Sequence, residues 1–445
     1  MARKVCPECN QKDTSWYWCK PCNSKHFQND FNNWTSGNDK IDKFIQDAQL
    51  NDNDRREVII EWIPYDRFKD VKQIGRGGFG TIHYARWIDG RIKEWDIENQ
   101  QWKRGKQKEV ALKKFDNIVN LNDVLNEMAI HLKIYTKFAS IQFYGITQDP
   151  ETYSYMMVLD YAKDGNIREY LKINFNNINW LQKLYHLSGL SLNLKNIHKL
   201  GIVHQDFHPG NILSYNFKIN IKISDFGLSK LIGANPNNPE KKNILGVLPY
   251  IAPEVLSGDE EYTKAADVYS FGIVAYEIVT GFPPYPDIPH DKDLAMKICN
   301  GLRPKIPFHT PKLITRTIMR CWDARVTHRP TFKELEKELN KYHRNYNDYL
   351  EYGRNKDSEI VIQIKKAENF SANQESTNAT TNTVTPRNYQ THPQAIYTSR
   401  LLNYSNLPKP KNEENFEREL EELTKSISNL CPSDSGIIDL DMSKF

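Results

Sequence analysis

The chain has 445 residues, which is longer than one typical domain and suggests two or three structural units. Its 60 basic and 56 acidic residues leave a formal net charge of +4, too small to create a field that attracts nucleic acid or membranes. No apolar run approaches the roughly 18 residues of a membrane helix, and the chain does not begin with an apolar signal segment. We therefore expect a soluble, cytoplasmic protein that binds neither nucleic acid nor membrane.

The N-terminus carries four of the seven cysteines, which form the pattern C-x2-C-x9-C-x2-C through Cys6, Cys9, Cys19 and Cys22. In an intracellular protein this paired spacing predicts four thiolates around one structural zinc ion, with a redox pair or incidental thiols as the alternatives. About 30 residues bury too little surface to fold alone, so the metal would stabilise a zinc-ribbon-like module at 1–34. We expect the module either to recruit a partner protein or to lie against the rest of the chain.

A polar linker with one short helical pattern follows at 35–62, and from 63 to 343 the chain reads first as strands and then as helices. Within this region, "VKQIGRGGFGTIHYARW" contains G-x-G-x-x-G between two strand-like runs. Glycines let backbone N–H groups approach phosphate oxygens closely. A dinucleotide-binding fold uses the same spacing before a helix, but here the chain continues as a strand, which favours a hairpin. A tight hairpin without a ligand is the plainer alternative.

Two further residues extend this phosphate site. "EVALKKF" places Lys113 on a strand that would point its amine beneath the loop, while Lys114 faces the other way. The polar stretch "DGRIKEWDIENQQWKRGKQK" between loop and lysine is predicted to be a surface excursion. In the helical pattern "LNDVLNEMAIHLKI", Glu127 is the acid that we expect to pair with Lys113, although it could be an ordinary exposed helix residue.

The stretch "IVHQDFHPGNIL", followed by "DFG" at 225–227 and "APE" at 252–254, completes an ordered set of motifs. With Lys113, this set resembles a eukaryotic protein kinase from about 66 to 342. The resemblance implies an α+β, bilobal fold, with a small and mainly antiparallel β lobe plus one helix and a larger helical lobe. It also implies an enzyme that uses Mg-ATP to phosphorylate a protein substrate.

The resemblance assigns a role to each motif residue. Asp206 would accept the proton of the attacked hydroxyl, Asn211 and Asp225 would hold Mg²⁺, and Lys113 with Glu127 would orient the phosphates. The nucleotide-binding set would be Ile74, Gly75, Arg76, Gly77, Gly78, Phe79, Gly80, Ile82, Ala111, Lys113, Leu159, Asp160, Ala162 and Leu213. In it, Leu159 would be the gatekeeper, and the backbone of Asp160 and Ala162 would face adenine. Glu254 with Arg329 would form a structural ion pair, and Asp267 would anchor the catalytic loop.

Three departures from the family pattern bear on control and substrate. Gln205 stands where many kinases have an arginine that holds a phosphorylated activation loop, and no serine, threonine or tyrosine occurs between 230 and 249. We therefore expect control by other means than activation-loop phosphorylation. His208 replaces the lysine usual in Ser/Thr kinases, and Val247 replaces a frequent threonine. The lobe looks most like the tyrosine-kinase-like Ser/Thr group, and the whole chain resembles members of large fungal kinase sets that have cysteine-led starts.

Two rival functions remain open at this point. "HxDxHPGN" is also the catalytic-loop pattern of small-molecule phosphotransferases of the aminoglycoside type, against which the "APE" and "DVYSFG" segments argue. A pseudokinase that binds nucleotide and partners without transfer is the non-enzymatic rival, against which the retained lysine, aspartates and asparagine argue.

The segment 344–445 is polar and expected to be mostly disordered, in keeping with a mean hydropathy of -0.68 for the chain. One pattern stands apart at 413–430, where five apolar residues at spacings of four, three, four and three share one helix face: Phe416, Leu420, Leu423, Ile427 and Leu430. This helix is predicted either to dock a partner protein or to lie against the core of its own chain.

Overall fold

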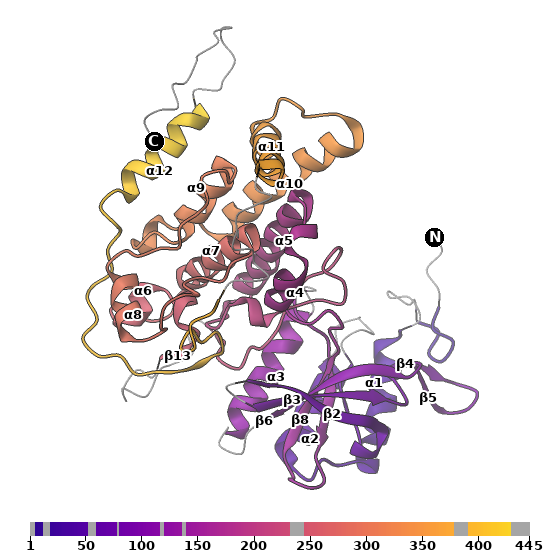
Figure 1. The fold of residues 1–445 in the computed structure, drawn as a ribbon. Coiled ribbons are helices and arrows are strands. Elements are labelled where there is room, and N and C mark those ends of the chain that lie inside the picture. The colour runs from indigo at the N-terminus through magenta and orange to yellow at the C-terminus, as the bar shows by residue number, and fades with distance from the viewer. Residues whose placement is uncertain are drawn as a thin grey trace.

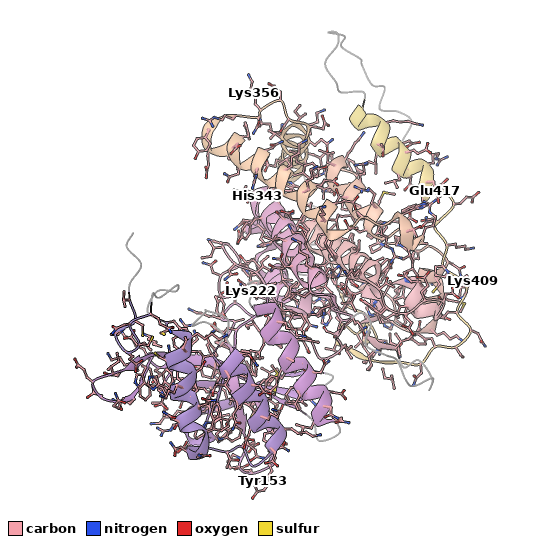
Figure 2. The ribbon with its side chains drawn as sticks, turned by 180° about the vertical axis from the view of Figure 1, so that it is seen from behind. Tyr153, Lys222, His343, Lys356, Lys409 and Glu417 are labelled. Carbon is pink, nitrogen blue, oxygen red and sulfur yellow. The ribbon has the colours of Figure 1, made fainter. Side chains whose placement is uncertain are left out.

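The structure is a computed structural model that describes residues 5–11, 18–51, 59–77, 80–115, 120–135, 139–231, 244–377 and 390–428. It consists of a β-rich lobe and a larger helical lobe, joined by the segment after strand β8 (Figure 1). Tyr153 lies at the far end of the β-rich lobe and Lys356 at the opposite end of the helical lobe (Figure 2). The α+β, bilobal arrangement expected from the motifs is confirmed.

The small lobe is built on a six-stranded sheet in the order β1-β7-β8-β6-β3-β2. Strand β1 runs parallel to β7, and every other pair in the sheet is antiparallel. The strands are β1 (Glu61–Trp62), β2 (Phe68–Gly77), β3 (Gly80–Trp87), β6 (Lys108–Phe115), β7 (Phe143–Gln148) and β8 (Tyr155–Asp160). Helix α3 (Leu121–Tyr135) covers one face of the sheet.

Alternation along β6 explains how the sheet is buried on both faces. Val110 and Leu112 enter one apolar cluster, whereas Ala111 and Phe115 belong to the cluster that α3 completes. Successive side chains of a strand point to opposite faces. Lys113 therefore points to the α3 side, and Lys114 to the other side, where it pairs with Asp149 at 2.7 Å.

The N-terminal residues pack against the small lobe. Helix α1 (Lys20–Asp30) leads through a short 3₁₀ turn to α2 (Asp39–Asn51). The α2 side chains Ile41 and Ile45 are fully buried in the same cluster as Val124 and Met128 of α3. The N-terminal residues therefore contribute to the core of the small lobe, on the side of α3.

The polar stretch before Lys113 forms an inserted hairpin of β4 (Ile92–Asp96) and β5 (Gln101–Arg104), whose side chains are mostly exposed or half-buried, as expected of a surface excursion. The sequence does not indicate its contacts with the N-terminal residues: Trp102 of β5 stacks on Phe27 of α1 with ring centroids 4.3 Å apart, and Trp95 of β4 stacks on His26 at 3.9 Å. The composition of the stretch is polar, yet its two tryptophans provide the apolar surface that receives the N-terminal residues.

The helical lobe surrounds α7 (Lys264–Thr280), which is buried along nearly its whole length and carries apolar residues on all of its faces. Capping boxes at Asn179 with Gln182 and at Thr331 with Glu334 begin two of the long helices. The helices are α4 (Ile167–Asn174), α5 (Trp180–Lys199), α6 (Pro253–Ser257), α7 (Lys264–Thr280), α8 (Lys292–Cys299), α9 (Lys312–Cys321) and α10 (Phe332–Tyr352). Short strands lie near the lobe junction: β9 (Ile202–Val203), β10 (Ile212–Leu213), β11 (Lys222–Ile223), β12 (Lys230–Leu231) and β13 (Ile244–Gly246).

The C-terminal residues differ from the expectation of a polar tail with little to bury. Helix α11 (Glu359–Thr377), strand β14 (Arg400–Leu402) and helix α12 (Phe416–Ser428) all contact the helical lobe. Phe416 is buried, and Leu420 and Leu423 pack beside it, so the predicted apolar face of α12 covers α9. Ile427 and Leu430 lie outside the described side chains. Lys409 and Glu417 lie on the outer edge of the helical lobe (Figure 2).

Membrane-spanning helices are not found in the described part of the chain, where no helix has the length and apolarity needed to cross a bilayer.

A buried lysine on α5 makes the stability of the helical lobe sensitive to pH. Lys183 donates to the carbonyl of Val279 at 2.9 Å, and burial lowers its pKa to about 7. The unfolded lysine keeps its proton until about pH 10, so between these values the unfolded state binds more protons than the folded state. Stability linked to this group therefore rises with pH across this window and is lower at and below pH 7.

We predict that the Lys183→Met variant loses this dependence. From pH 7 to pH 10, the stability of the wild type relative to the variant should rise, by up to about 1.4 kcal/mol per pH unit. Thermal melting of both proteins over this range provides the measurement. A difference in melting temperature that does not change with pH would contradict the prediction.

Candidate functional site

The site begins with a buried cation. Lys113 lies on β6 opposite Ile82 of β3, and its side chain is almost fully buried. Its Nζ lies 2.6 Å from Oε1 of Glu127 on α3 and 2.8 Å from Oδ1 of Asp225. Burial alone would lower the pKa of Lys113, but the carboxylates of Asp225 and Glu127 raise it above its usual value. The ammonium therefore stays charged and links a strand, a helix and the "DFG" segment.

The backbone of the "DFG" segment is adapted to this arrangement. Asp225 has a left-handed φ of 59°, which is uncommon for a residue with a side chain. Burial opposes ionisation of this carboxyl, but Lys113 lowers the pKa of Asp225 to about 2. A Cβ at Gly227 would lie 3.2 Å from Oε2 of Glu127, so glycine gives the carboxylate its room.

Edge-to-face and tilted ring contacts connect α3 to the catalytic loop. Phe226 lies between His131 of α3 and His204, with ring centroids 4.9 and 5.0 Å away, and His131 continues to Phe143 of β7 at 6.4 Å. Burial lowers the pKa of His131 to about 3, so the ring is neutral at ordinary pH and packs as an apolar group. These ring contacts therefore tie the position of α3 to that of the loop.

Asp267 of α7 holds the catalytic loop by its backbone, as the family resemblance implies. Its fully buried carboxylate accepts from the N–H of His204 at 2.9 Å, from the N–H of Gln205 at 3.2 Å and from Nε2 of His198 at 2.8 Å. Gln205 has a left-handed φ of 68°, a strained value that these bonds help to maintain. The loop is thus anchored through backbone groups, without use of the Gln205 side chain.

Asp206 lies next to these anchors and is almost fully buried. Nδ2 of Asn211 donates to the backbone carbonyl of Asp206 at 3.0 Å, which fixes the two residues relative to each other. The hydroxyl of Ser399 donates to Oδ2 of Asp206 at 2.5 Å. A carboxylate that accepts from an aliphatic hydroxyl is arranged as a general base for that hydroxyl.

His208 also belongs to this group. Its Nδ1 accepts from the N–H of Gly210 at 3.1 Å, so the remaining ring proton is on Nε2. Nε2 lies 3.6 Å from Oδ2 of Asp206 and 3.3 Å from the Ser399 hydroxyl. The ring that replaces the usual lysine is therefore turned toward the Asp206 carboxylate and the Ser399 hydroxyl.

Some of the predicted nucleotide-binding residues lie together on the α3 side of the sheet. Leu159 lies in the apolar cluster on the α3 side, with Ala111, Ala162 and Leu213 packed against it. The N–H of Asp160 donates to the carbonyl of Gln142 at 2.9 Å, which fixes the start of the segment between the lobes. These residues form an apolar surface close to Lys113 in the sheet.

The glycine-rich loop is described only in part, because Gly78 and Phe79 lie outside the described residues. Gly75 pairs with Ile82 across the β2–β3 hairpin, while Ile74 is exposed, and Arg76 and Gly77 continue the pairing to Gly80. A Cβ at Gly80 would lie 1.9 Å from the carbonyl oxygen of Lys114, so this glycine is required for the close approach of β3 and β6.

The ion pair expected between the "APE" motif and the last part of the helical lobe is present. The guanidinium of Arg329 donates to both carboxylate oxygens of Glu254 at 2.7 Å, and both side chains are buried. This bidentate pair joins α6 to the segment before α10, and its role is structural.

The four N-terminal cysteines also come together. Their sulfur atoms all lie within 4.8 Å of one another, with 3.8 Å between Cys6 and Cys22 and 3.5 Å between Cys9 and Cys19. Four thiolates bound tetrahedrally to zinc at about 2.3 Å would lie roughly 3.8 Å apart, so the cluster fits one zinc ion. Cys19 is the N-cap of α1, so the second pair sits at a helix start.

Sequence reasoning missed Ser399 and the residues around it. Their signal was weak but present, since "AIYTSRLLNY" at 395–404 carries six apolar or aromatic side chains within a polar tail. Nothing in the sequence alone indicated that this stretch would return to Asp206.

We predict that Lys113 and Lys114 contribute very differently to stability. Lys113→Met leaves the buried carboxylate of Glu127 and the partly exposed one of Asp225 without their cation and should lower the free energy of unfolding by about 3 kcal/mol or more. Lys114→Met breaks a more exposed pair and should cost about 1 kcal/mol or less. Denaturant titration of both variants measures the difference, and equal losses would contradict the arrangement around Lys113.

A second prediction concerns the cysteine cluster. The full chain should carry about one zinc ion, which Cys22→Ser should remove, together with part of the thermal stability of the small lobe. Cys299→Ser, at a buried cysteine outside the cluster, serves as the control and should keep the metal. Elemental analysis and thermal melting provide the two measurements. A wild-type protein purified without chelator that holds much less than one zinc per chain would refute the prediction.

Comparison with known proteins identifies the family. Residues 68–339 match the family of protein tyrosine and serine/threonine kinases. The tyrosine-protein kinase SPK-1 of Girardia tigrina is 30% identical over 60% of this chain and 52% of its own length. The putative serine/threonine-protein kinase/receptor R831 of Acanthamoeba polyphaga mimivirus is 31% identical over 68% of this chain and 17% of its own length. The probable serine/threonine-protein kinase roco5 of Dictyostelium discoideum is 30% identical over 62% of this chain and 10% of its own length.

This chain thus spans about half or less of the length of these relatives, whose names include both tyrosine and serine/threonine kinases. The ordered motifs, the paired lysine and the anchored catalytic loop all fall inside the matched residues, which make up more than half of the chain. The chain belongs to the protein tyrosine and serine/threonine kinase family.

Proposed function

We propose that this protein is an ATP-dependent kinase that transfers the γ-phosphoryl group of Mg-ATP to serine or threonine hydroxyls of proteins. The observation that carries the proposal is the serine hydroxyl 2.5 Å from the carboxylate of Asp206, in a site whose Lys113 is already paired with Glu127. A base in contact with an aliphatic hydroxyl and a cation held beside the "DFG" aspartate are the protein groups that this transfer requires.

Each residue has one task in this proposal. Asp206 orients the hydroxyl and takes its proton, and Asn211 holds Asp206 through its backbone carbonyl. Lys113 binds phosphate oxygens, oriented by Glu127. Asp225 and Asn211 offer the hard oxygen atoms that would hold Mg²⁺, which neutralises phosphate charge when bound.

The preference for serine or threonine is supported by the reach of the side chain. Ser399 immediately precedes β14, which pairs with β13, and from that backbone position its short side chain reaches Asp206. A tyrosine on the same backbone would carry its hydroxyl several ångströms farther and beyond the carboxylate. This argument favours serine or threonine over tyrosine as the acceptor residue.

Control without activation-loop phosphorylation is a further part of the proposal. The loop has no phosphate acceptor between 230 and 249, and Gln205 offers no charge to hold one. The contacts that organise the site are made by Asp267 with the loop backbone and by Glu127 with Lys113. For the N-terminal cysteines we propose a structural zinc ion that holds α1 against the β4–β5 hairpin.

We predict that Asp206→Ala lowers phosphoryl transfer to a generic protein substrate by about a hundredfold or more, because the general base is lost. Nucleotide binding should remain, since Lys113 and Asp225 are unchanged. Asp259→Ala, which removes an exposed carboxylate of the same lobe, is the matched control and should keep full activity. Labelled-phosphate transfer and the thermal shift caused by a non-hydrolysable ATP analogue measure the two properties.

The same experiment separates the rival functions. If the wild type transfers no more phosphate than Asp206→Ala but binds the analogue, the protein is a nucleotide-binding scaffold. If it phosphorylates small sugars and no protein, it is a small-molecule phosphotransferase. Either result would refute the proposed function.

A further inference from the structure

Residues 390–404 lie along the site, and Ser399 among them contacts Asp206. Strand β14 pairs antiparallel with β13, in the register Ile244 to Leu402 and Gly246 to Arg400. Ser399 directly precedes this strand, and its hydroxyl donates to Asp206 at 2.5 Å. The backbone hydrogen bonds of a strand pair fix the register, so the serine, and no neighbouring residue, faces the carboxylate.

Contacts on the N-terminal side of Ser399 are made by Tyr397. Its carbonyl accepts from Arg168 of α4 at 3.2 Å, and its ring lies 4.6 Å from the same guanidinium. The Tyr397 hydroxyl donates to the carbonyl of Pro284 at 2.8 Å. Arg168 is itself held by Glu277 at 3.0 Å, so Tyr397 meets a preformed surface of the helical lobe.

Contacts on the C-terminal side are made by Arg400 and Leu402. The guanidinium of Arg400 donates to the carbonyl of His290. Leu402 is 3% exposed and lies in an apolar cluster with Leu248, Ile251 and Ile298. Leu401, which lies between these two residues on the strand, points outward and is 47% exposed. Alternate side chains of β14, those of Arg400 and Leu402, therefore hold the strand against the helical lobe.

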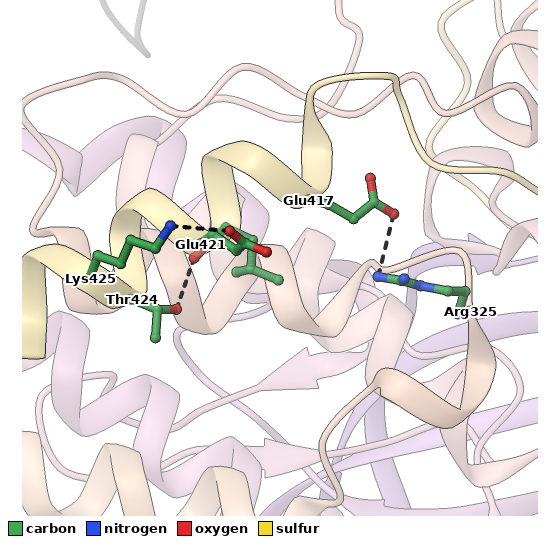
Figure 3. Close-up of a pocket in the computed structure, with 6 residues that line it drawn as sticks. Arg325, Glu417, Glu421, Thr424 and Lys425 are labelled. Atoms are coloured by element: carbon green, nitrogen blue, oxygen red, sulfur yellow. Dashed lines mark hydrogen bonds and ion pairs between the residues drawn. The ribbon is translucent and has the colours of Figure 1, made fainter.

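The chain is fastened again after it leaves the site. The N–H of Lys411 donates to the carbonyl of Cys299 at 2.9 Å, and the side chain of Asn412 donates to Asp323 at 2.8 Å. Glu417 of α12 pairs with Arg325 at 3.4 Å, beside a pocket that α12 forms with the helical lobe (Figure 3). The chain that contacts Asp206 through Ser399 is thus also bound to the helical lobe farther along, at residues 411–417.

We propose that residues 390–404 are an intramolecular substrate and that Ser399 is phosphorylated in cis by the site that its own chain carries; this rests on the proposed function. The Ser399 oxygen forms a bond to the γ-phosphorus of ATP, the bond from that phosphorus to the bridging oxygen breaks, and ADP leaves. The hydroxyl proton passes to the carboxylate of Asp206.

The product of this step is less compatible with the site than the serine. A phosphoserine carries a charge of about -1.5 to -2 at pH 7 and would lie beside the Asp206 carboxylate. Like charges repel, and Arg168, the cation near Tyr397, is already paired with Glu277. Phosphorylation of Ser399 therefore weakens the hold of the segment on the site.

The test uses the full chain with Mg-ATP. Intact mass should show the addition of one phosphoryl group, and peptide mapping should place it on Ser399. The first-order rate constant should not change with protein concentration, because the reaction is within one chain. Ser399→Ala should lose this phosphoryl group, whereas Thr398→Ala, which removes the exposed hydroxyl next to it, should keep it.

A second pair of variants tests the seating of the strand. Leu402→Asp should slow Ser399 phosphorylation by about tenfold or more, since burial of a leucine contributes at least that factor. Leu401→Asp places the same charge on the exposed face of the strand and should leave the rate within about twofold of the wild type. Equal effects of the two changes would overturn the proposed placement.

The outcomes separate this inference from the proposed function. Transfer to an added protein without phosphate on Ser399, or a Ser399 rate that rises in proportion to protein concentration, overturns phosphorylation in cis and leaves the kinase assignment intact. Absence of transfer both to added protein and to Ser399 refutes the proposed function and this inference together.

Discussion

The structure depends on the burial of a single ammonium group. Lys113 has almost no contact with water, so its charge must be compensated within the protein, and the carboxylates of Glu127 and Asp225 pair with it. One carboxylate comes from α3 and the other from the "DFG" segment, while the lysine comes from the sheet. Separating the lysine from either carboxylate would cost electrostatic energy. The ion pairs therefore hold β6, α3 and the "DFG" segment together. The ring contacts of Phe226 and the hydrogen bonds to Asp267 connect these parts to the catalytic loop.

Parts of the chain outside residues 68–339 pack against both lobes, close to the residues of the site. On the small lobe, α2 buries Ile41 and Ile45 beside Met128, one residue after Glu127. On the helical lobe, β14 covers β13 and places Ser399 against Asp206. The kinase core is therefore contacted at both ends of its catalytic machinery by parts of the chain that lie outside the family match.

Sequence reasoning worked best where chemistry fixes both residue type and spacing. The pairs Lys113 with Glu127 and Glu254 with Arg329, and the anchoring of the catalytic-loop backbone by Asp267, lie in the structure as their motifs imply. Each of these residues must present a particular charge or hydrogen-bonding group, so the local sequence retains the signal. The α12 face was also readable, because helical periodicity is a local property.

Reasoning from sequence failed where the outcome depended on contacts between distant segments. The β4–β5 hairpin reads as polar, and only the rings of α1 reveal why it carries Trp95 and Trp102. Gly80 reads as a phosphate-loop glycine, but its contact with the backbone of Lys114 gives it a packing role that no motif describes. Ser399 lies 193 positions from Asp206, and no short-range pattern relates the two.

The position of α2 has a practical consequence for the choice of fragment. A chain trimmed to residues 68–339, the extent of the family match, would lack α2, β1, β14 and α12 together. The faces of Val124, Met128 and α9 that these elements cover would become exposed apolar surface, which promotes aggregation. Such a fragment would also present β13 uncovered, so a rate measured on it would describe a site that β14 and Ser399 no longer contact.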